Sequence, residues 1–114
     1  MTAHVDRVID GDTFDASAAI WIGQTIAIRV RIAGLDAPEL RARCDAERDR
    51  AEAARAYLSR RIAGGDVRLS AVRHDKYGGR IDARVADARG DIAEQMIRAG
   101  LARPYDGGRR QGWC

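Results

Sequence analysis

The sequence is short of the features that mark several classes of protein. No apolar run approaches the roughly 20 residues that a membrane span requires, and the only prolines, Pro38 and Pro104, mark no interdomain linker. Cysteine occurs only at Cys44 and Cys114, and together with two scattered histidines these residues lack the spacing of zinc ligands. A chain of 114 residues with this composition is expected to form one soluble globular domain, residues 1–114, without a zinc site.

Lysine is almost absent as well, since Lys76 is the only lysine among twenty basic residues. The others are arginines, whose planar guanidinium binds phosphate through a fork of donors. With seventeen acidic residues the formal net charge is +3, which suits a polyanionic partner but fits a solvated basic surface equally well. No pattern indicates a protein or membrane partner, and we expect a monomer.

The first third of the chain has the alternation and turn signals of three strands. Residues 4–9 and 13–22 flank the tight turn Asp10-Gly11, and Gly23-Gln24 is a second turn signal. The third strand alternates strictly, with Ile26, Ile28, Val30 and Ile32 on one side and Ala27, Arg29, Arg31 and Ala33 on the other. This period predicts one buried face, and Arg31 must point away from it.

The rest of the chain predicts a helix, two strands and a second helix. Residues 46–63 have helical spacing of apolar side chains and are followed by a glycine pair. Residues 67–72 and 81–86 have the pattern of strands, and Asp91 can cap a short helix whose inward residues are Ile92, Met96 and Ile97. The order βββαββα is that of a mainly β protein with two helices (α+β), and it is compatible with a five-stranded Greek-key barrel of the OB type.

Three polar clusters fall at turns or strand ends, where side chains are held rigidly and still face solvent. The first is Asp10-Gly11-Asp12, the second runs from Arg31 to Glu39, and the third spans residues 74–80. Taken singly, each is better explained as a hairpin tip or a strand end with solvated charges. Taken together, the first two could supply the hard oxygen ligands that calcium prefers, from Asp10, Asp12, Asp36 and Glu39.

The motifs in and around these clusters resemble those of the staphylococcal nuclease (thermonuclease-like) family. They are Val8-Ile9-Asp10-Gly11-Asp12-Thr13, Arg31 through Asp36-Ala37-Pro38-Glu39, Asp75-Lys76-Tyr77-Gly78-Gly79-Arg80 and Ile97-Arg98-Ala99-Gly100-Leu101-Ala102. The resemblance runs from about Val5 to Tyr105 and keeps the family's order. It implies an enzyme, a calcium-dependent nuclease that hydrolyses single-stranded or locally opened DNA or RNA and leaves a 3′-phosphate and a 5′-hydroxyl. The alternative is a catalytically degenerate OB-fold module that binds nucleic acid or protein.

The resemblance also implies a role for each residue of the site. Asp12 and Asp36 would be carboxylate ligands of calcium, the backbone carbonyl of Ala37 would be a third ligand, and Asp10 would lie behind them. Arg31 and Arg80 would grip the phosphate, Glu39 would hold or deprotonate the attacking water, and Lys76, Tyr77 and Tyr105 would border the nucleotide. This set agrees with the chemistry, because attack on an anionic phosphodiester requires a divalent cation and arginines to neutralise its charge.

The sequence departs from the family pattern in the third motif and at Ala37, which replaces a threonine. Two glycines instead of one residue precede Arg80, so we expect Arg80 on a bulge, whereas Arg84 fits poorly because it lies well along the following strand. Tyr105 lies one position from a nucleotide-stacking tyrosine of the family.

The sequence also lacks the long C-terminal helix of the best-known family members, and a Cys44–Cys114 disulfide would instead tie the tail to the segment before the first helix. Residues 1–3 leave no room for the charged and apolar regions of a signal peptide, but a signal could have been removed, so the compartment stays open. Export to the periplasm or the medium is favoured if a signal has been removed and the two cysteines pair.

Overall fold

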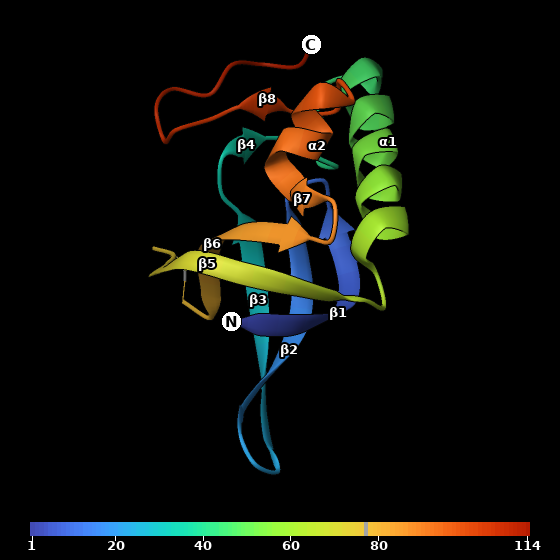
Figure 1. The fold of residues 1–114 in the computed structure, drawn as a ribbon. Helices are drawn as coiled ribbons and strands as arrows, with labels where there is room; N and C mark the ends of the chain where they lie inside the picture. Colours follow the sequence, from blue (N-terminus) through green and yellow to red (C-terminus); the bar gives the residue numbers. More distant parts are fainter. Residues whose placement is uncertain (77) are drawn as a thin grey trace.

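The computed structural model describes residues 1–76 and 78–114, and its centre is a closed five-stranded β-barrel (Figure 1). The barrel strands are β1 (Thr2–Asp10), β2 (Thr13–Trp21), β3 (Gln24–Ile32), β5 (Asp66–His74) and β6 (Arg80–Asp87). All neighbouring pairs are antiparallel except β3 and β6, which pair in parallel and close the barrel. The order β1-β2-β3-β6-β5 is the Greek-key connectivity of the OB type. The predicted fold class is therefore confirmed.

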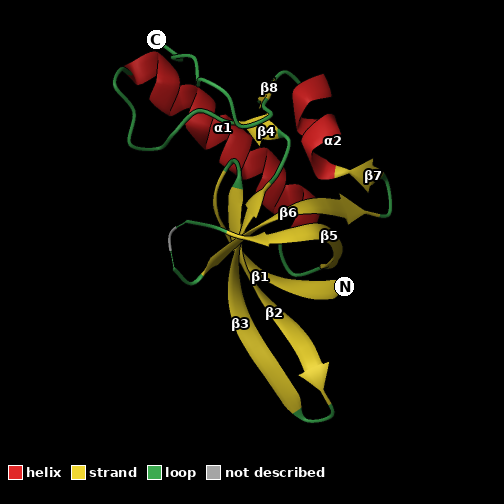
Figure 2. Cartoon of the chain, turned by 90° about the vertical axis from the view of Figure 1, so that its left-hand side faces the viewer, coloured by secondary structure: helices red, strands yellow, loops and turns green. Residues whose placement is uncertain are grey.

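Both predicted helices are present, and each begins at a side-chain cap. Helix α1 (Asp45–Ile62) starts and ends within one residue of the predicted range, and the Sγ of its N-cap, Cys44, accepts from the backbone N–H of Glu47 at 3.4 Å. Helix α2 (Ile92–Arg98) is capped by Asp91, whose Oδ2 accepts from the N–H of Glu94 at 3.1 Å. The two helices lie together at one end of the barrel (Figure 2). Within the described residues, neither helix has the length and apolarity needed to cross a membrane.

Three strands of only two residues each were not predicted from the sequence: β4 (Leu35–Asp36), β7 (Gly90–Asp91) and β8 (Arg103–Pro104). They are too short to show a period of two. Strand β4 pairs with β8, so that Asp36 lies opposite Arg103. This pairing places the C-terminal part of the chain beside Asp36 (Figure 1).

The core lies between the barrel and the two helices. Its largest fully buried side chains are Phe14, Ile32, Leu35, Leu58, Ile92 and Met96. Ile92 and Met96 point inward as predicted, whereas Ile97 is only partly buried against the same cluster.

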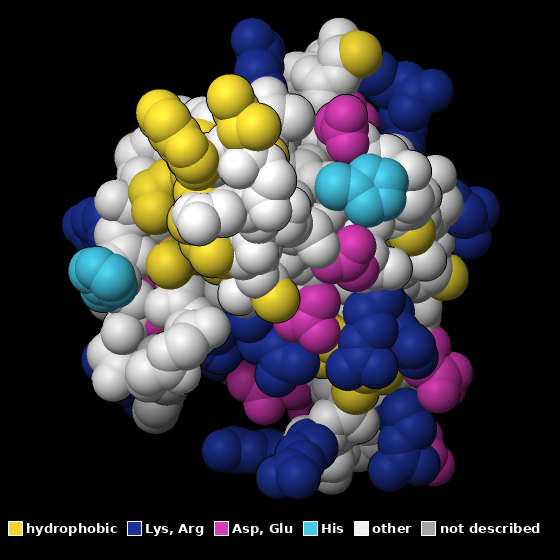
Figure 3. Space-filling view, turned by 90° about the horizontal axis from the view of Figure 1, so that it is seen from below, with side chains coloured by type: hydrophobic (Ala, Val, Ile, Leu, Met, Phe, Trp, Pro, Cys, Tyr) yellow, Lys and Arg dark blue, Asp and Glu magenta, His cyan; other side chains and the backbone are white. Residues whose placement is uncertain are grey.

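The prediction of one buried face along the third strand is wrong for its first half. Val30 and Ile32 are fully buried, but Ile28 is half-buried and Ile26 is 39% exposed. The reason is that β3 pairs with β6 only from Arg29 to Ile32, and before that point the β2–β3 hairpin extends beyond the barrel (Figure 2). Hydrophobic side chains gather at this projecting end, where Ile20, Trp21 and Ile22 are exposed (Figure 3).

The last residues of the chain run back over the helical end of the barrel. A disulfide joins Cys44 to Cys114, with 6.0 Å between the two Cα atoms and a separation of 70 positions in the sequence. Arg103 stacks on the Trp113 ring at 3.8 Å and donates from Nη1 to the carbonyl of Gly112 at 2.9 Å. The segment is therefore held to β8 and to the start of α1.

Candidate active site

The turn between β1 and β2 is held against α1 and the loop after β4 by the close approach of Gly11. A Cβ atom added to Gly11 would lie 2.9 Å from the Cβ of Ala54 and 3.0 Å from the Cβ of Ala37. A side chain at this position would push the turn away from both neighbours. Glycine is therefore required here for space, and the contact brings Asp10 and Asp12 close to the segment that begins at Asp36.

Asp12 sits in a nearly buried position beside a second carboxylate. Its Oδ1 accepts from the Thr13 hydroxyl at 2.9 Å, and its Oδ2 lies 3.9 Å from Nη2 of Arg31. Burial, followed by the neighbouring Asp10 carboxyl, raises the pKa of Asp12 to about 7. Asp10 in turn accepts the backbone N–H of Asp12 at 3.1 Å, which fixes the shape of the turn. The turn thus holds two carboxyl groups beside the guanidinium of Arg31.

Asp36 and Glu39 share one cationic partner. Asp36 lies in β4 with 3% of the residue exposed, whereas the Glu39 side chain is 55% exposed. Arg110 from the C-terminal segment donates from Nε to Asp36 Oδ1 at 2.7 Å and from Nη1 to Glu39 Oε1 at 2.9 Å. Ala37, next to Asp36, is buried.

The carboxylates of Asp12 and Asp36 and the backbone carbonyl of Ala37 provide oxygen atoms of the kind that bind a hard cation. Among the described residues, no group of three or more His, Cys, Asp or Glu side chains is arranged to hold a metal ion. The expected set has only two carboxylates, Asp12 and Asp36, and one backbone carbonyl, that of Ala37. Calcium accepts such a mixture and completes its coordination with water. The guanidinium on Asp36 shows that a positive charge is accommodated at this carboxylate.

A cleft of about 770 Å³ lies next to Asp12 and Asp36, because Arg31 and Arg110, which contact these carboxylates, both line it. The cleft brings together four side chains that are expected to contact the substrate: Arg31, Lys76, Arg80 and Tyr105. The parallel β3–β6 pairing creates the arrangement, because it sets Arg31 beside Asp82 and starts β6 at Arg80. Arg31 also lies 5.8 Å from the centre of the Tyr105 ring. Tyr77 lies outside the described residues.

Arg80 enters the cleft by a route that differs from the expected bulge. Gly79 precedes it with φ of +78°, a conformation that glycine adopts without strain, and β6 begins directly afterwards. The irregularity in the pairing lies instead in β5, between Ser70 and Arg73, where Ala71 has φ of +48°. Arg80 Nη2 lies 3.0 Å from Asp75 Oδ2.

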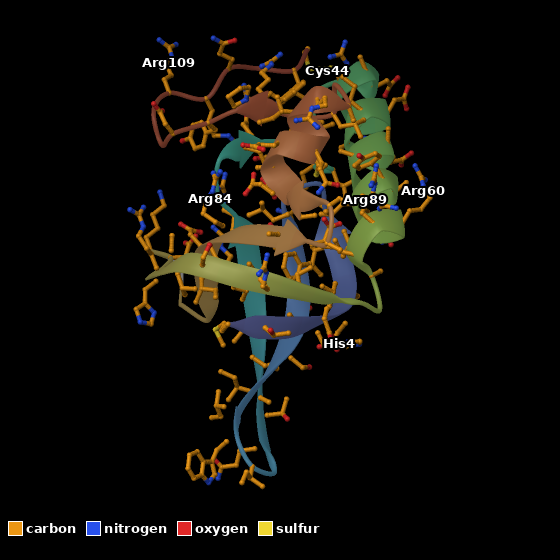
Figure 4. All side chains as sticks on the ribbon, in the orientation of Figure 1. His4, Cys44, Arg60, Arg84, Arg89 and Arg109 are labelled. Atoms are coloured by element: carbon orange, nitrogen blue, oxygen red, sulfur yellow. A yellow bond between two sulfur atoms is a disulfide. The ribbon has the colours of Figure 1, made fainter. Side chains whose placement is uncertain are left out.

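Three further arginines line the same cleft: Arg73, Arg84 and Arg110. The position of Arg84 along the strand predicts a poor fit to the site, but residues 80, 82 and 84 share one face of β6 because side chains alternate along a strand. Figure 4 shows Arg84 at the upper edge of β6, where its guanidinium lies against Gly34 and occupies the space that a Cβ atom on this glycine would need. The spacing of two residues was therefore a usable signal, whereas nothing local in the sequence pointed to Arg110.

The cleft contains carboxylates as well as arginines. Asp82 is paired with Arg31 across β3 and β6, and its pKa is raised by burial and by the nearby Asp75 carboxyl, while the charges of Arg31 and Arg80 oppose the rise. An arriving phosphate would replace these carboxylates as an anionic partner of the guanidinium groups.

Comparison with known proteins assigns the chain to a family. A model of the staphylococcal nuclease homologues matches residues 29–111. The chain belongs to this family. The matched range contains Arg31, Asp36, Glu39, Lys76, Arg80 and Arg110, whereas Asp10 and Asp12 precede it.

The chain is also similar to a curated protein, the probable endonuclease LCL3 of the fungus Arthroderma otae. The two are 38% identical over 84 residues, which make up 69% of this chain and 29% of the relative. The chain thus spans less than a third of the length of that relative.

Proposed function

We propose that this chain, as a single staphylococcal nuclease-like domain, is a calcium-dependent nuclease that hydrolyses phosphodiester bonds of DNA or RNA. The observation that carries the proposal is the common cleft of Arg31, Lys76, Arg80 and Tyr105, with Asp12 linked to its edge through Arg31. Family membership and the probable endonuclease relative support the same reaction class. A groove with cations and an aromatic ring suits single-stranded or locally opened nucleic acid.

The arginines would bind and orient the scissile phosphate. Arg31 and Arg80 reach the cleft from the two strands that close the barrel, so their positions are fixed relative to each other. Forked donors from both sides can follow the phosphoryl oxygens as charge builds on them in the transition state. Lys76, Tyr77 and Tyr105 would border the nucleotide.

Glu39 would hold the attacking water and take its proton. The oxygen of that water bonds to phosphorus, the bond to the 5′-oxygen breaks, and the leaving oxygen takes up a proton from solvent. The products would be a 3′-phosphate and a 5′-hydroxyl. Asp12, Asp36 and the Ala37 carbonyl would hold calcium, which when bound polarises the phosphoryl oxygen and orients the water.

A binding module without catalysis is the second candidate. Its support is the ion pair of Arg110 with both Asp36 and Glu39, which occupies two groups that hydrolysis requires. The two candidates differ in whether calcium displaces this pair and whether cleavage follows.

The test is cleavage of a single-stranded oligonucleotide and a supercoiled plasmid after chelation and stepwise addition of calcium. We expect no cleavage in chelator, faster cleavage of the single strand with calcium, and poor replacement by magnesium, which surrenders water reluctantly. Direct phosphorylation of the products by polynucleotide kinase would identify 5′-hydroxyl ends.

Asp36→Asn removes the charge of one proposed ligand and should nearly abolish cleavage. Asp66→Asn is the matched control, because Asp66 is an exposed carboxylate at the other side of the barrel, hydrogen bonded to His4 at 3.0 Å. Undiminished cleavage in chelator or by Asp36→Asn would refute the proposed metal role. Tight binding of the single strand without cleavage would favour the binding module.

A further inference from the structure

The guanidinium of Arg110 neutralises a carboxylate that has little access to water. The Asp36 side chain is 4% exposed, and Arg110 reaches its Oδ1 with both Nε and Nη2. The third nitrogen, Nη1, bonds to Glu39. A buried carboxylate without a cation would be strongly unfavourable, so this pair stabilises the charge of Asp36.

Contacts on both sides of Arg110 keep it near the two carboxylates. Before it, the Tyr105 hydroxyl donates to the carbonyl of Gly108 at 2.8 Å. After it, Gly112 and Trp113 are held by Arg103, and Cys114 is bonded to Cys44. A charge tethered at both ends has a high effective concentration at its partner, because little freedom is lost when the pair forms.

We propose that Arg110 is an internal counter-cation that competes with calcium for Asp36, and that the Cys44–Cys114 disulfide keeps it in place. This inference rests on the proposed calcium role of Asp36. Calcium on either oxygen of the carboxylate would lie within a few Å of the guanidinium, where like charges repel strongly. Calcium binding therefore requires Arg110 to move away, and the apparent affinity is lower by the free energy of the broken pair.

A purely structural role for Arg110 makes a different prediction. If the arginine only pinned the tail, its removal would lower the free energy of unfolding and leave the calcium affinity of the folded protein unchanged. The calcium dissociation constant therefore separates the two roles.

The experiment is calorimetric titration of chelator-treated protein with calcium alone, without nucleic acid. We expect Arg110→Ala to bind calcium roughly tenfold more tightly than the wild type, the value of one charged hydrogen bond. Arg110→Lys, which keeps the charge but loses the fork, should lie between them. The matched control is Arg109→Ala, which removes the same charge from the adjacent residue, exposed at the outer edge of the segment (Figure 4); it should stay within about twofold of the wild type.

The disulfide is tested by combining its removal with the Arg110 variant. The Cys44→Ser/Cys114→Ser variant should bind calcium more tightly than the wild type, because the arginine is less confined. The same change made in Arg110→Ala should leave the affinity unaltered, since no competing charge remains. Thermal unfolding of each sample identifies the temperature range in which all variants are folded.

Two sets of outcomes overturn the inference in different ways. If Arg110→Ala bound calcium no more tightly than the wild type, or if Arg109→Ala gained as much affinity as Arg110→Ala, then Arg110 would not compete with calcium. The proposal of a calcium-dependent nuclease would be unaffected. Absence of calcium binding in the wild type and in every variant removes the calcium site itself, and the inference with it.

Discussion

Both ends of the β2–β3 hairpin contain large apolar side chains, but their surroundings are opposite. At the end inside the barrel, Ile32 is fully buried and Arg31 faces the cleft with 18% of its side chain exposed. At the projecting end, Trp21 and Ile22 are 72% and 90% exposed. The difference arises because β6 covers β3 only from Arg29 onward. Alternation along a strand thus predicts which side chains share a face, while a neighbouring strand decides whether that face is buried.

The distribution of charge follows the same division. Residues 16–28, which form the projecting part, include no charged side chain, whereas the other end carries the arginines and carboxylates of the cleft. Charged groups are therefore concentrated where the closed barrel holds them in fixed positions.

The largest expected contrast in stability is between two isoleucines on one face of β3. Ile32→Ala should lower the free energy of unfolding by about 2–5 kcal/mol, because it removes a fully buried side chain and leaves a cavity. Ile26→Ala should lower it by less than about 1 kcal/mol, since its side chain already contacts water. Urea denaturation of both variants measures the difference, and equal losses would show that the projecting part is buried in solution.

The disulfide between the C-terminal tail and the start of α1 should contribute nearly as much to the free energy of unfolding as a core side chain. Replacement of Cys44 and Cys114 by serine should lower the free energy of unfolding by about 2–4 kcal/mol, because the bond closes a long loop in the unfolded chain. The hairpin end has no such tie, and Trp21→Ser should change stability by less than about 0.5 kcal/mol. Denaturation with and without reductant provides the comparison, and no effect of reductant on the wild type would contradict it.

At the cleft, the geometry of one arginine should matter more than its charge. Arg80→Lys is expected to lower kcat and kcat/KM together by about 100-fold, because lysine loses the forked donors. Arg29 lies beside Arg80 in the sheet but bonds to Asp15 on the outer surface, at 2.8 Å. Arg29→Lys should therefore leave steady-state kinetics nearly unchanged. Near-wild-type turnover in Arg80→Lys would remove Arg80 from the mechanism.

The smallest effects are expected from pH, and they should have opposite signs at two aspartates. The pKa of Asp12 rises from 3.8 to about 7, so the folded protein binds more protons than the unfolded one between these values. The stability from Asp12 is present below pH 3.8 and is lost as the pH rises through about 7. At Asp15 the hydrogen bond from Arg29 lowers the pKa, so its contribution is present above the unfolded value and is lost as the pH falls.

Urea denaturation in chelator, from acid to neutral pH, tests both signs against matched variants. The stability of the wild type relative to Asp12→Asn should fall with rising pH, and its stability relative to Asp15→Asn should increase. If the free energies of unfolding of the wild type and Asp12→Asn changed in parallel with pH over this range, the result would contradict the raised pKa of Asp12.

Local sequence patterns were sufficient for the five barrel strands, the two helices and the fold class. The spacing of apolar residues and the caps located α1 and α2 to within one residue, because helix ends depend on nearby side chains. The order of strands and helices, with four motifs, led to the family that the comparisons then showed. The roles of Arg31, Glu39, Arg80 and the carboxylates remain predictions that the experiments above address.

By itself, then, the sequence determined the five barrel strands, the two helices and the family, since these depend on short-range periodicity and on motifs. Only the tertiary structure decided that β6 leaves Ile26 uncovered and that Arg110 reaches Asp36, which lies 74 positions earlier in the sequence. The physical reason is that burial and ion pairing depend on distances between segments, which barrel closure, the β4–β8 pairing and the disulfide establish together. No period or motif within one segment carries that information.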